Sequence, residues 1–205
     1  MNPVKSIFNR YAVAFVKWAG AKVGLYVYDF PQASPCGAVL IYSVDDTHVH
    51  MLTTKRAQKM GGKRSLSAGG FYEVIEMLPM KDGEFRDGRI DIYREMIEEL
   101  GEEMKDIIPE DVFLKNASYI CDLMIRGHGN TVRHATTHGL QVSKDVLDKI
   151  LQLSNTEEQV GKVIETLPLS ADKTPQETIA ERLHDFQYNE EVFAAKRWYA
   201  NLVKK

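Results

Sequence analysis

The sequence predicts one domain of mixed α and β structure, an α+β or α/β sandwich. Segments rich in β-branched and aromatic residues alternate along the chain with segments of helical periodicity, an order that places helices against a sheet. One of these helices, over residues 90–104, has a clear apolar stripe. The chain of 205 residues is long enough to bury a core without disulfides or metals to hold it. We therefore expect one globular domain.

The first third of the chain contains most of the predicted strands. Apolar residues at spacings of three and four over residues 4–18 predict an amphipathic helix, or a helix running into a strand. Turn signals at Asp45-Asp46 predict a hairpin, and the glycine pairs at 61–62 and 69–70 bound one short strand. The strands are expected over residues 23–30, 37–44, 47–55 and 64–68.

The helix over residues 90–104 carries two different stripes. Tyr93, Met96 and Leu100 belong to an apolar one, and glutamates form the other. Gly101 is a typical helix end signal. This helix is therefore expected to pack one face on the sheet and to present carboxylates on another.

The second half of the chain repeats the same kinds of signal. Residues 117–125 and 131–142 flank Gly127–Asn130 and predict a second hairpin, after which Ser143 caps a helix to about Leu153. Residues 162–169 fit a strand or a helix. Thr174, Pro175 and Glu177 make a capping-box start, and Asn189 begins another helix.

Composition favours a protein of the cytoplasm with a small substrate. Cys36 and Cys121 form neither a disulfide framework nor a zinc motif, which favours a reducing compartment. Lys17 and Lys22 interrupt the apolar N-terminal stretch, so neither a signal peptide nor a membrane span is expected. With 26 basic and 29 acidic side chains, the net charge of −3 gives no general attraction for a long nucleic acid.

Three glutamates on the strongest helix are the candidate chemical centre. Glu95, Glu98 and Glu99 lie three and four residues apart, so their carboxylates are expected to project from one helix face and converge. Their mutual repulsion would be relieved by a hard cation, Mg²⁺ or Mn²⁺. Arg94, four residues before Glu98, is placed to orient a carboxylate. The alternative is a solvated helix face with salt bridges and no chemistry.

The glutamates belong to a segment that resembles the second half of the Nudix box, R-E-U-x-E-E-x-G with U apolar. The segment is Arg94-Glu95-Met96-Ile97-Glu98-Glu99-Leu100-Gly101. Residues 66–73 are similar to the strand and glycine pair that enter the box, with Ala68 in place of the usual proline. Residues 38–56 resemble the family's opening hairpin, and residues 156–170 resemble a later acidic segment and strand. The resemblance covers about residues 37–185.

The sequence departs from the family pattern in the length of the box. Gly70 to Glu102 spans 33 residues, about ten more than usual, so the first half can be read with its glutamate at Glu76 or at Glu84. Glu102 also stands where an apolar residue is usual. The segment from Val74 to Arg89 contains the insertion, and we expect it to govern which substrate is accepted.

The resemblance implies a fold and a set of site residues. The fold would be an α/β/α sandwich with a mixed sheet: an N-terminal extension (1–36), the core (37–185) and an added C-terminal helix (186–205). Glu95, Glu98 and Glu99 would hold Mg²⁺ or Mn²⁺ with help from Gly70, and Arg94 would orient them. Further candidates are Glu157 and Glu158 as an additional acid or metal ligand, and Arg56, Glu73 and Glu76 for substrate binding.

The implied activity is hydrolysis of a phosphoanhydride bond in a nucleoside diphosphate derivative. Substrates of this class include ADP-ribose, dinucleoside polyphosphates, nicotinamide dinucleotides and the 5′ end of RNA. For RNA, a local basic patch would serve, and a homodimer is a further option. The alternatives are a binding module of the same fold without catalysis, and an unrelated acidic-helix protein that acts through protein contacts. The residues of the candidate basic patch are Lys55, Arg56, Lys59, Lys63 and Arg64.

Overall fold

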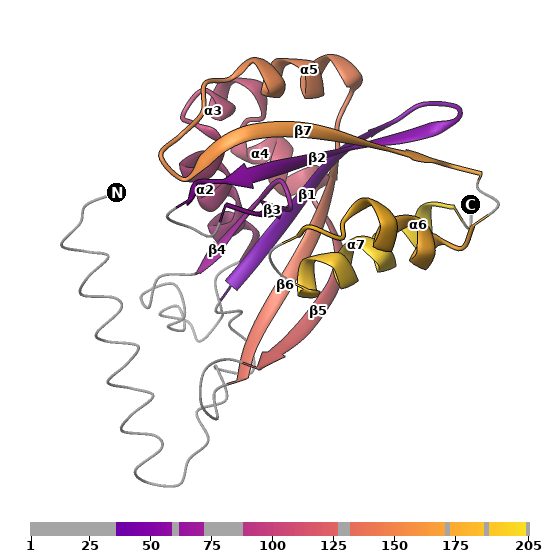
Figure 1. The fold of residues 1–205 in the computed structure, drawn as a ribbon. Helices are drawn as coiled ribbons and strands as arrows, with labels where there is room; N and C mark the ends of the chain where they lie inside the picture. Colours follow the sequence, from indigo (N-terminus) through magenta and orange to yellow (C-terminus); the bar gives the residue numbers. More distant parts are fainter. Residues whose placement is uncertain are drawn as a thin grey trace, which may run out of the picture.

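A computed structural model describes residues 36–58, 62–71, 88–126, 132–170, 173–186 and 189–203 (Figure 1). It contains strands β1 (Cys36–Val44), β2 (His48–Arg56), β3 (Arg64–Ser65), β4 (Ala68–Phe71), β5 (Ser118–Arg126), β6 (Val132–Gln141) and β7 (Gln159–Pro168). The helices are α2 (Gly88–Leu100), α3 (Met104–Ile107), α4 (Glu110–Asn116), α5 (Lys144–Gln152), α6 (Pro175–Arg182) and α7 (Asn189–Leu202).

The seven strands form one mixed sheet centred on β1. On one side of β1 lies β6, which is parallel to it, and β5 follows as the edge strand, antiparallel to β6. On its other side, β1 pairs with β2 through Tyr42–Val44 and with β4 through Cys36–Val39, both antiparallel. β2 also pairs with β3 and β7. β4 is thereby held beside the first residues of β1.

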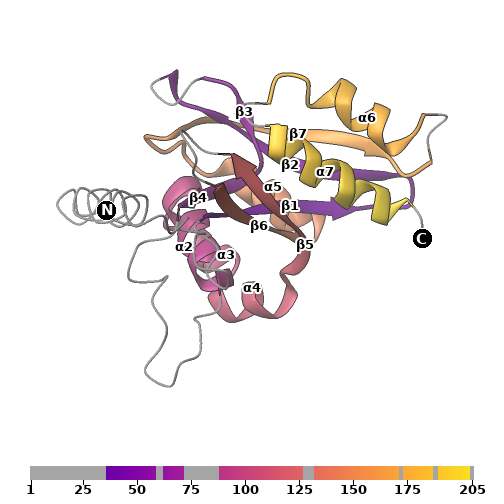
Figure 2. The same cartoon turned by 90° about the horizontal axis from the view of Figure 1, so that it is seen from below.

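Helices cover both faces of the sheet, and β1 shows why. Its side chains alternate, so Val39 and Ile41 are buried with the helices α2 to α5, while Leu40 and Tyr42 are buried with α6 and α7. Figure 2 shows α6 and α7 on one side of the sheet and α2 to α4 on the other. The predicted α/β/α sandwich with a mixed sheet is confirmed.

Local signals placed several elements correctly. Both predicted hairpins are present, as β1–β2 and β5–β6. Ser143 caps α5 by accepting a hydrogen bond from the Val146 N–H, and Thr174 and Glu177 form a complete capping box on α6. α2 ends at Leu100 because Gly101 has a φ of 114°, which an L side chain rarely adopts.

Two predicted regions differ in the structure, and one open alternative is decided by it. The single strand expected over residues 64–68 is two short strands, because β3 pairs with β2 while β4 pairs with β1. The helix over residues 90–104 ends at Leu100, as the end signal at Gly101 predicted and short of Met104, and α3 and α4 follow without having been predicted. Residues 162–169, which fitted either type, lie mainly in β7. These residues form a strand because β7 pairs with β2, which is distant in sequence.

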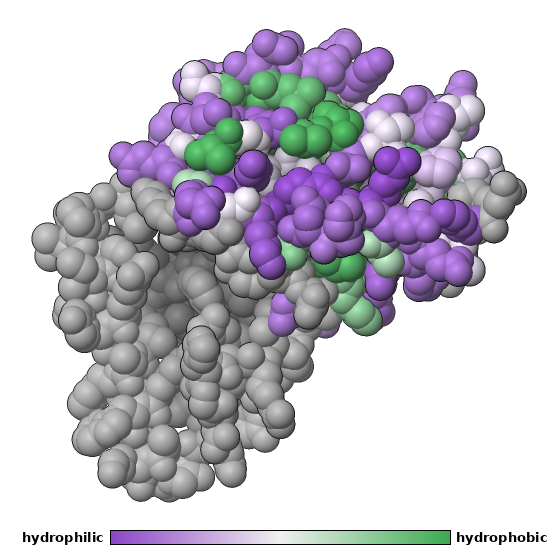
Figure 3. Space-filling view, in the orientation of Figure 1, coloured by the Kyte–Doolittle hydropathy of each residue, from purple (hydrophilic) through white to green (hydrophobic). Residues whose placement is uncertain are grey.

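Several expectations fall outside the described residues: the elements over 4–18 and 23–30, the residues Glu73, Glu76 and Glu84, and most of the insertion after Val74. Among the helices of the described ranges, none is long and apolar enough to cross a membrane. Figure 3 shows hydrophilic side chains over most of the visible coloured face and apolar ones gathered over α5 and β7. On β7, Val160 and Val163 are exposed.

Candidate functional site

Helix α2 presents its three glutamates at different depths. Its apolar stripe packs in the core under the sheet, with Ile92, Met96 and Leu100 fully buried. The side chain of Glu98 is 38% exposed and that of Glu95 is 15% exposed, whereas Glu99 as a residue is only 3% exposed. The glutamate stripe is therefore turned partly toward the protein, and Glu99 lies inside it.

Protein donors surround the carboxylate of Glu99. Its Oε2 accepts hydrogen bonds from the Gly69 N–H at 3.0 Å and from the Gln159 amide at 2.8 Å. Its Oε1 lies 3.2 Å from a guanidinium nitrogen of Arg56. The Thr156 hydroxyl donates to the Glu99 backbone carbonyl at 2.8 Å. Glu99 thus connects α2 to β4, to the end of β2 and to the start of β7.

Burial makes the charge of two of these carboxyls costly. It raises the pKa of Glu99 to about 7, although Arg56 and the Gly69 N–H act in the opposite direction. The pKa of Glu95 is also raised to about 7, first by burial and next by the charge of Glu98. Both groups would ionise more readily beside a cation.

Arg94 lies between the other two glutamates of the helix. One of its guanidinium nitrogens is 3.3 Å from Glu95 Oε1, and Nε is 3.8 Å from Glu98 Oε1. The predicted contact with Glu98, four residues along the helix, is therefore present, and Glu95 is a second partner. Arg94 is placed to limit the orientations of both carboxylates.

Of the two acidic residues expected near the site, Glu158 contacts Arg56. Its Oε2 is 3.7 Å from the same Arg56 nitrogen that contacts Glu99, and its side chain is 45% exposed. The side chain of Arg56 is itself only 10% exposed. Arg56, a candidate for substrate binding, is thus occupied by carboxylates, and Glu157 is exposed beside Glu158.

The sequence analysis missed Thr156, Gln159 and Glu191. The first two hold Glu99, and the Gln159 N–H in turn donates to the Thr156 hydroxyl at 3.2 Å. Glu191, on α7, accepts a hydrogen bond from the Ser65 hydroxyl at 2.6 Å. Burial raises the pKa of Glu191 to about 7, with Arg56 lowering it and Glu99 raising it further. No local pattern marks these residues, because each acts across the fold.

The carboxylates suit a divalent cation by their chemistry. Mg²⁺ and Mn²⁺ take oxygen ligands, and Glu95, Glu98 and Glu99 offer them with charge that two arginines only partly balance. Within the described ranges, however, no three acidic, histidine or cysteine side chains are gathered closely enough to hold an ion. The predicted convergence of the three carboxylates is thus not present, since Glu99 turns toward its protein donors.

Gly69 and Gly70 lie in β4 against the start of β1. A Cβ at Gly69 would meet the Gly37 carbonyl oxygen at 2.9 Å, so glycine is required there for close strand packing. Gly70 pairs with Gly37 in the same register. The glycine pair therefore places the Gly69 N–H beside Glu99, while the expected role of the Gly70 carbonyl stays a prediction.

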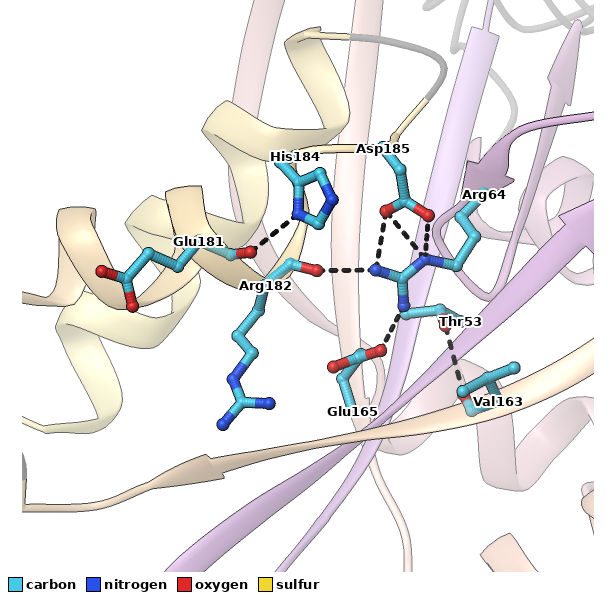
Figure 4. Close-up of polar contacts among 8 residues, drawn as sticks. All are labelled: Thr53, Arg64, Val163, Glu165, Glu181, Arg182, His184 and Asp185. Atoms are coloured by element: carbon cyan, nitrogen blue, oxygen red, sulfur yellow. Dashed lines mark hydrogen bonds and ion pairs between the residues drawn. The ribbon is translucent and has the colours of Figure 1, made fainter.

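A second arginine of the expected basic patch is also occupied. Arg64 donates to Asp185 through Nε and a terminal nitrogen at 2.7–2.9 Å, and to the Arg182 carbonyl at 2.6 Å (Figure 4). It also pairs with Glu165 and lies 5.4 Å from the centre of the Phe186 ring. Of the patch residues that are described, Lys55 and Lys63 remain exposed.

Comparisons with known proteins found distant structural similarity. No protein-family model matches the sequence, and no curated protein is significantly similar to it. Solved structures with a similar fold include a C. elegans Ap4A hydrolase binary complex, which is 9% identical with a TM-score of 0.49 and matches 84% of this chain and 100% of its own. A mutT/nudix family protein from Listeria innocua is 15% identical with a TM-score of 0.49, over 83% and 95% of the two chains. A Nudix hydrolase from M. smegmatis, RenU, is 13% identical with a TM-score of 0.38, over 83% and 86%.

The fold and the glutamate helix are the features that the Nudix resemblance implied. The mixed sheet lies between two helical layers, and the helix with Arg94, Glu95, Glu98 and Glu99 packs against the glycine strand β4. The chain therefore has the α/β/α architecture and the glutamate-bearing helix that the resemblance implied. Because the similar structures share 15% identity or less, any activity has to be argued from the residues of this chain.

Proposed function

We propose that this chain is a Mg²⁺- or Mn²⁺-dependent Nudix hydrolase that cleaves a phosphoanhydride bond in a nucleoside diphosphate derivative. The observation that carries the proposal is the excess of carboxylates on and around α2. Glu95, Glu98, Glu99 and Glu158 share the two guanidinium groups of Arg56 and Arg94, and the pKa values of Glu95 and Glu99 are raised to about 7. A divalent cation supplies the missing positive charge.

In this proposal each residue has a limited task. Glu95 and Glu98 would be the more accessible ligands, Glu99 the buried one, and Arg94 would orient the first two. When bound, the cation supplies charge stabilisation on the phosphate and on the leaving oxygen. A water oxygen forms the new bond to phosphorus, the anhydride P–O bond breaks, and a carboxylate that is not bound to the cation accepts the proton. The products are a nucleoside monophosphate and a second phosphate compound.

The occupied arginines favour a small nucleotide over RNA as the substrate. Arg56 and Arg64, two members of the expected basic patch, are paired with acidic side chains. Lys55 and Lys63 are the exposed basic residues of the patch in the described part of the chain. We therefore place ADP-ribose, dinucleoside polyphosphates and nicotinamide dinucleotides before RNA 5′ ends as candidates.

The experiment is a product screen with the full chain in the presence of Mg²⁺ or Mn²⁺. It would include the three small-molecule classes and a 5′-modified RNA. Release of a nucleoside monophosphate that stops when the cation is chelated is the expected result. Binding of a compound without any product would instead identify a binding module of the same fold and overturn the proposed catalysis.

A further inference from the structure

Glu191 is a buried carboxyl that the proposed hydrolysis does not use. Glu191 is the third residue of α7, on the opposite face of the sheet from α2, and its carboxylate accepts a hydrogen bond from the Ser65 hydroxyl through Oε1 and is also held by the backbone N–H of Leu66. Ser65 pairs with Thr54 in β2, two residues before Arg56. The β3–β2 pairing therefore carries an acidic side chain of the C-terminal helix to the region of Arg56.

Two complementary atoms in this region lack partners. Within the described part of the chain, the buried Oε2 of Glu191 and the buried Nε of Arg56 have no hydrogen-bond partner. The charge of Arg56 lowers the pKa of Glu191, and the charge of Glu99 raises it. The three groups are therefore close enough to interact electrostatically. An open carboxylate oxygen and an open guanidinium N–H are costly when buried apart and favourable when paired.

The metal-free arrangement also leaves a problem for the proposed hydrolase. Arg56 lies 3.2 Å from Glu99, and Gly69 and Gln159 donate to the other oxygen of the same carboxylate. A cation that takes Glu99 as a ligand competes with Arg56 for this negative charge. The guanidinium would then keep only Glu158, which is 45% exposed and lies 3.7 Å from the same nitrogen, too far for a hydrogen bond. Because a buried guanidinium with so little compensation is costly, a further acceptor for Arg56 would stabilise the metal-bound arrangement.

We propose that Glu191 is this further acceptor: a positioning residue that takes over Arg56 when Glu99 turns to the divalent cation. The open Oε2 of Glu191 then receives the guanidinium, and Ser65 keeps the carboxylate in place during the exchange. The C-terminal helix α7 thereby becomes part of the metal-binding mechanism. This inference rests on the proposed function.

The test is the Mn²⁺ affinity of the full chain, measured by calorimetric titration without substrate. Glu191→Gln keeps the size and the Ser65 contact but removes the charge that would hold Arg56. We expect it to weaken Mn²⁺ binding by about tenfold, the lower end of the effect of outer-shell partners of metal ligands. Glu190→Gln removes the neighbouring charge of the same helix turn and should change the affinity by less than about twofold.

The Arg56→Gln variant distinguishes an exchange of partners by Arg56 from a direct electrostatic effect of the Glu191 charge on the cation. If Glu191 acts through Arg56, Glu191→Gln has no further effect on Mn²⁺ affinity in the Arg56→Gln background. An undiminished tenfold loss in that background, or an unchanged affinity in the single variant, overturns the inference. Should Glu191→Gln fail to fold, Ser65→Ala is measured instead, because it frees the same carboxylate and should weaken Mn²⁺ binding only when Arg56 is present.

The outcome also separates this inference from the proposed function. A wild-type chain that binds Mn²⁺ and releases nucleoside monophosphate, but whose Glu191→Gln variant binds Mn²⁺ equally well, overturns the exchange alone. A wild-type chain that neither binds Mn²⁺ nor cleaves any compound of the screen overturns both.

Discussion

Arg56 and Arg64 lie at the two ends of the β2–β3 connection, but their surroundings differ in charge balance. Arg64 reaches Asp185 through two nitrogens, pairs with Glu165, and packs over Phe186. The pKa of Asp185 is lowered, chiefly by its hydrogen bonds with Arg64, so the ionised form is the favoured one. Arg56 contacts Glu99 and Glu158 through one nitrogen, while its Nε has no partner among the described residues.

This difference separates a stabilising cluster from one that suits a ligand. In the Arg64 cluster, the ion pairs with Glu165 and Asp185 favour the folded state without a bound ligand. Around Arg56, burial raises the pKa of Glu99 and of Glu191 to about 7, so the negative charges there are unfavourable until a cation arrives. The comparison predicts that changes at the α2 glutamates affect turnover, while changes at Arg64 affect stability.

The largest effect is expected from Glu98→Gln. It removes the charge of the most exposed glutamate of the triplet, which is 38% exposed, so the fold should remain intact. Turnover of the best substrate should fall by at least about a hundredfold. The control is Glu102→Gln, whose side chain is 77% exposed and pairs with Lys105 beyond the end of α2. If Glu98→Gln and Glu99→Gln both kept full turnover, the proposed site would be wrong.

Arg64→Met should lower stability instead. It keeps an apolar stem over Phe186 but leaves Glu165, whose side chain is 15% exposed, without its cation. A loss of about 3 kcal/mol in the free energy of unfolding is expected from an uncompensated buried charge. Chemical denaturation measures it, and turnover per folded molecule should stay within about twofold.

A second change checks the cause of that loss. Adding Glu165→Gln to Arg64→Met removes the stranded charge and should restore part of the stability. If the double variant were less stable than Arg64→Met alone, then packing over Phe186, and not charge balance, would hold the cluster together.

A smaller effect should follow from adding the cation. Mn²⁺ at about ten times its dissociation constant should raise the thermal midpoint of the wild-type protein by about 3–6 °C, because it binds only the folded carboxylate cluster. The triple variant Glu95→Gln, Glu98→Gln, Glu99→Gln should not respond, whereas Arg64→Met should respond like the wild type. Equal shifts in the wild type and the triple variant would place the metal elsewhere.

Local sequence signals accounted for much of the fold. The α2 stripe, the Ser143 cap and the Thr174–Glu177 capping box involve contacts within four residues, so their patterns are visible in the sequence. β3 and β4 contain two and four residues, too few for an alternating pattern to identify their separate partners. The resemblance placed the candidate glutamates on one helix, which is where they lie.

The surroundings of those glutamates could not be predicted. Gln159 is 60 residues from Glu99, and Ser65 is 126 residues from Glu191, so only the sheet register brings them together. Glu191 follows Glu190 in the first turn of α7, where an acidic residue usually suits the helix dipole and indicates nothing more. The inward turn of Glu99, which replaced the expected convergence, depends on these distant donors.

The smallest effect concerns the pH dependence of the metal-free protein. The pKa values of Glu95, Glu99 and Glu191 are raised from an ordinary 4.5 to about 7, so the folded state retains protons that the unfolded chain has lost. The stability that these groups contribute is complete below pH 4.5 and is lost as the pH rises to about 7. Glu191→Gln removes one of the three, so its free energy of unfolding should decline less steeply over that range. Denaturation in the presence of a chelator at about pH 5, 6, 7 and 8 measures this slope.

Asp185, in the Arg64 cluster, has a lowered pKa and acts only at more acidic pH, so Asp185→Asn should leave the slope between these values unchanged. Parallel curves for the wild type and Glu191→Gln would mean that Glu191 is not the uncompensated carboxyl that distinguishes the Arg56 region from that of Arg64.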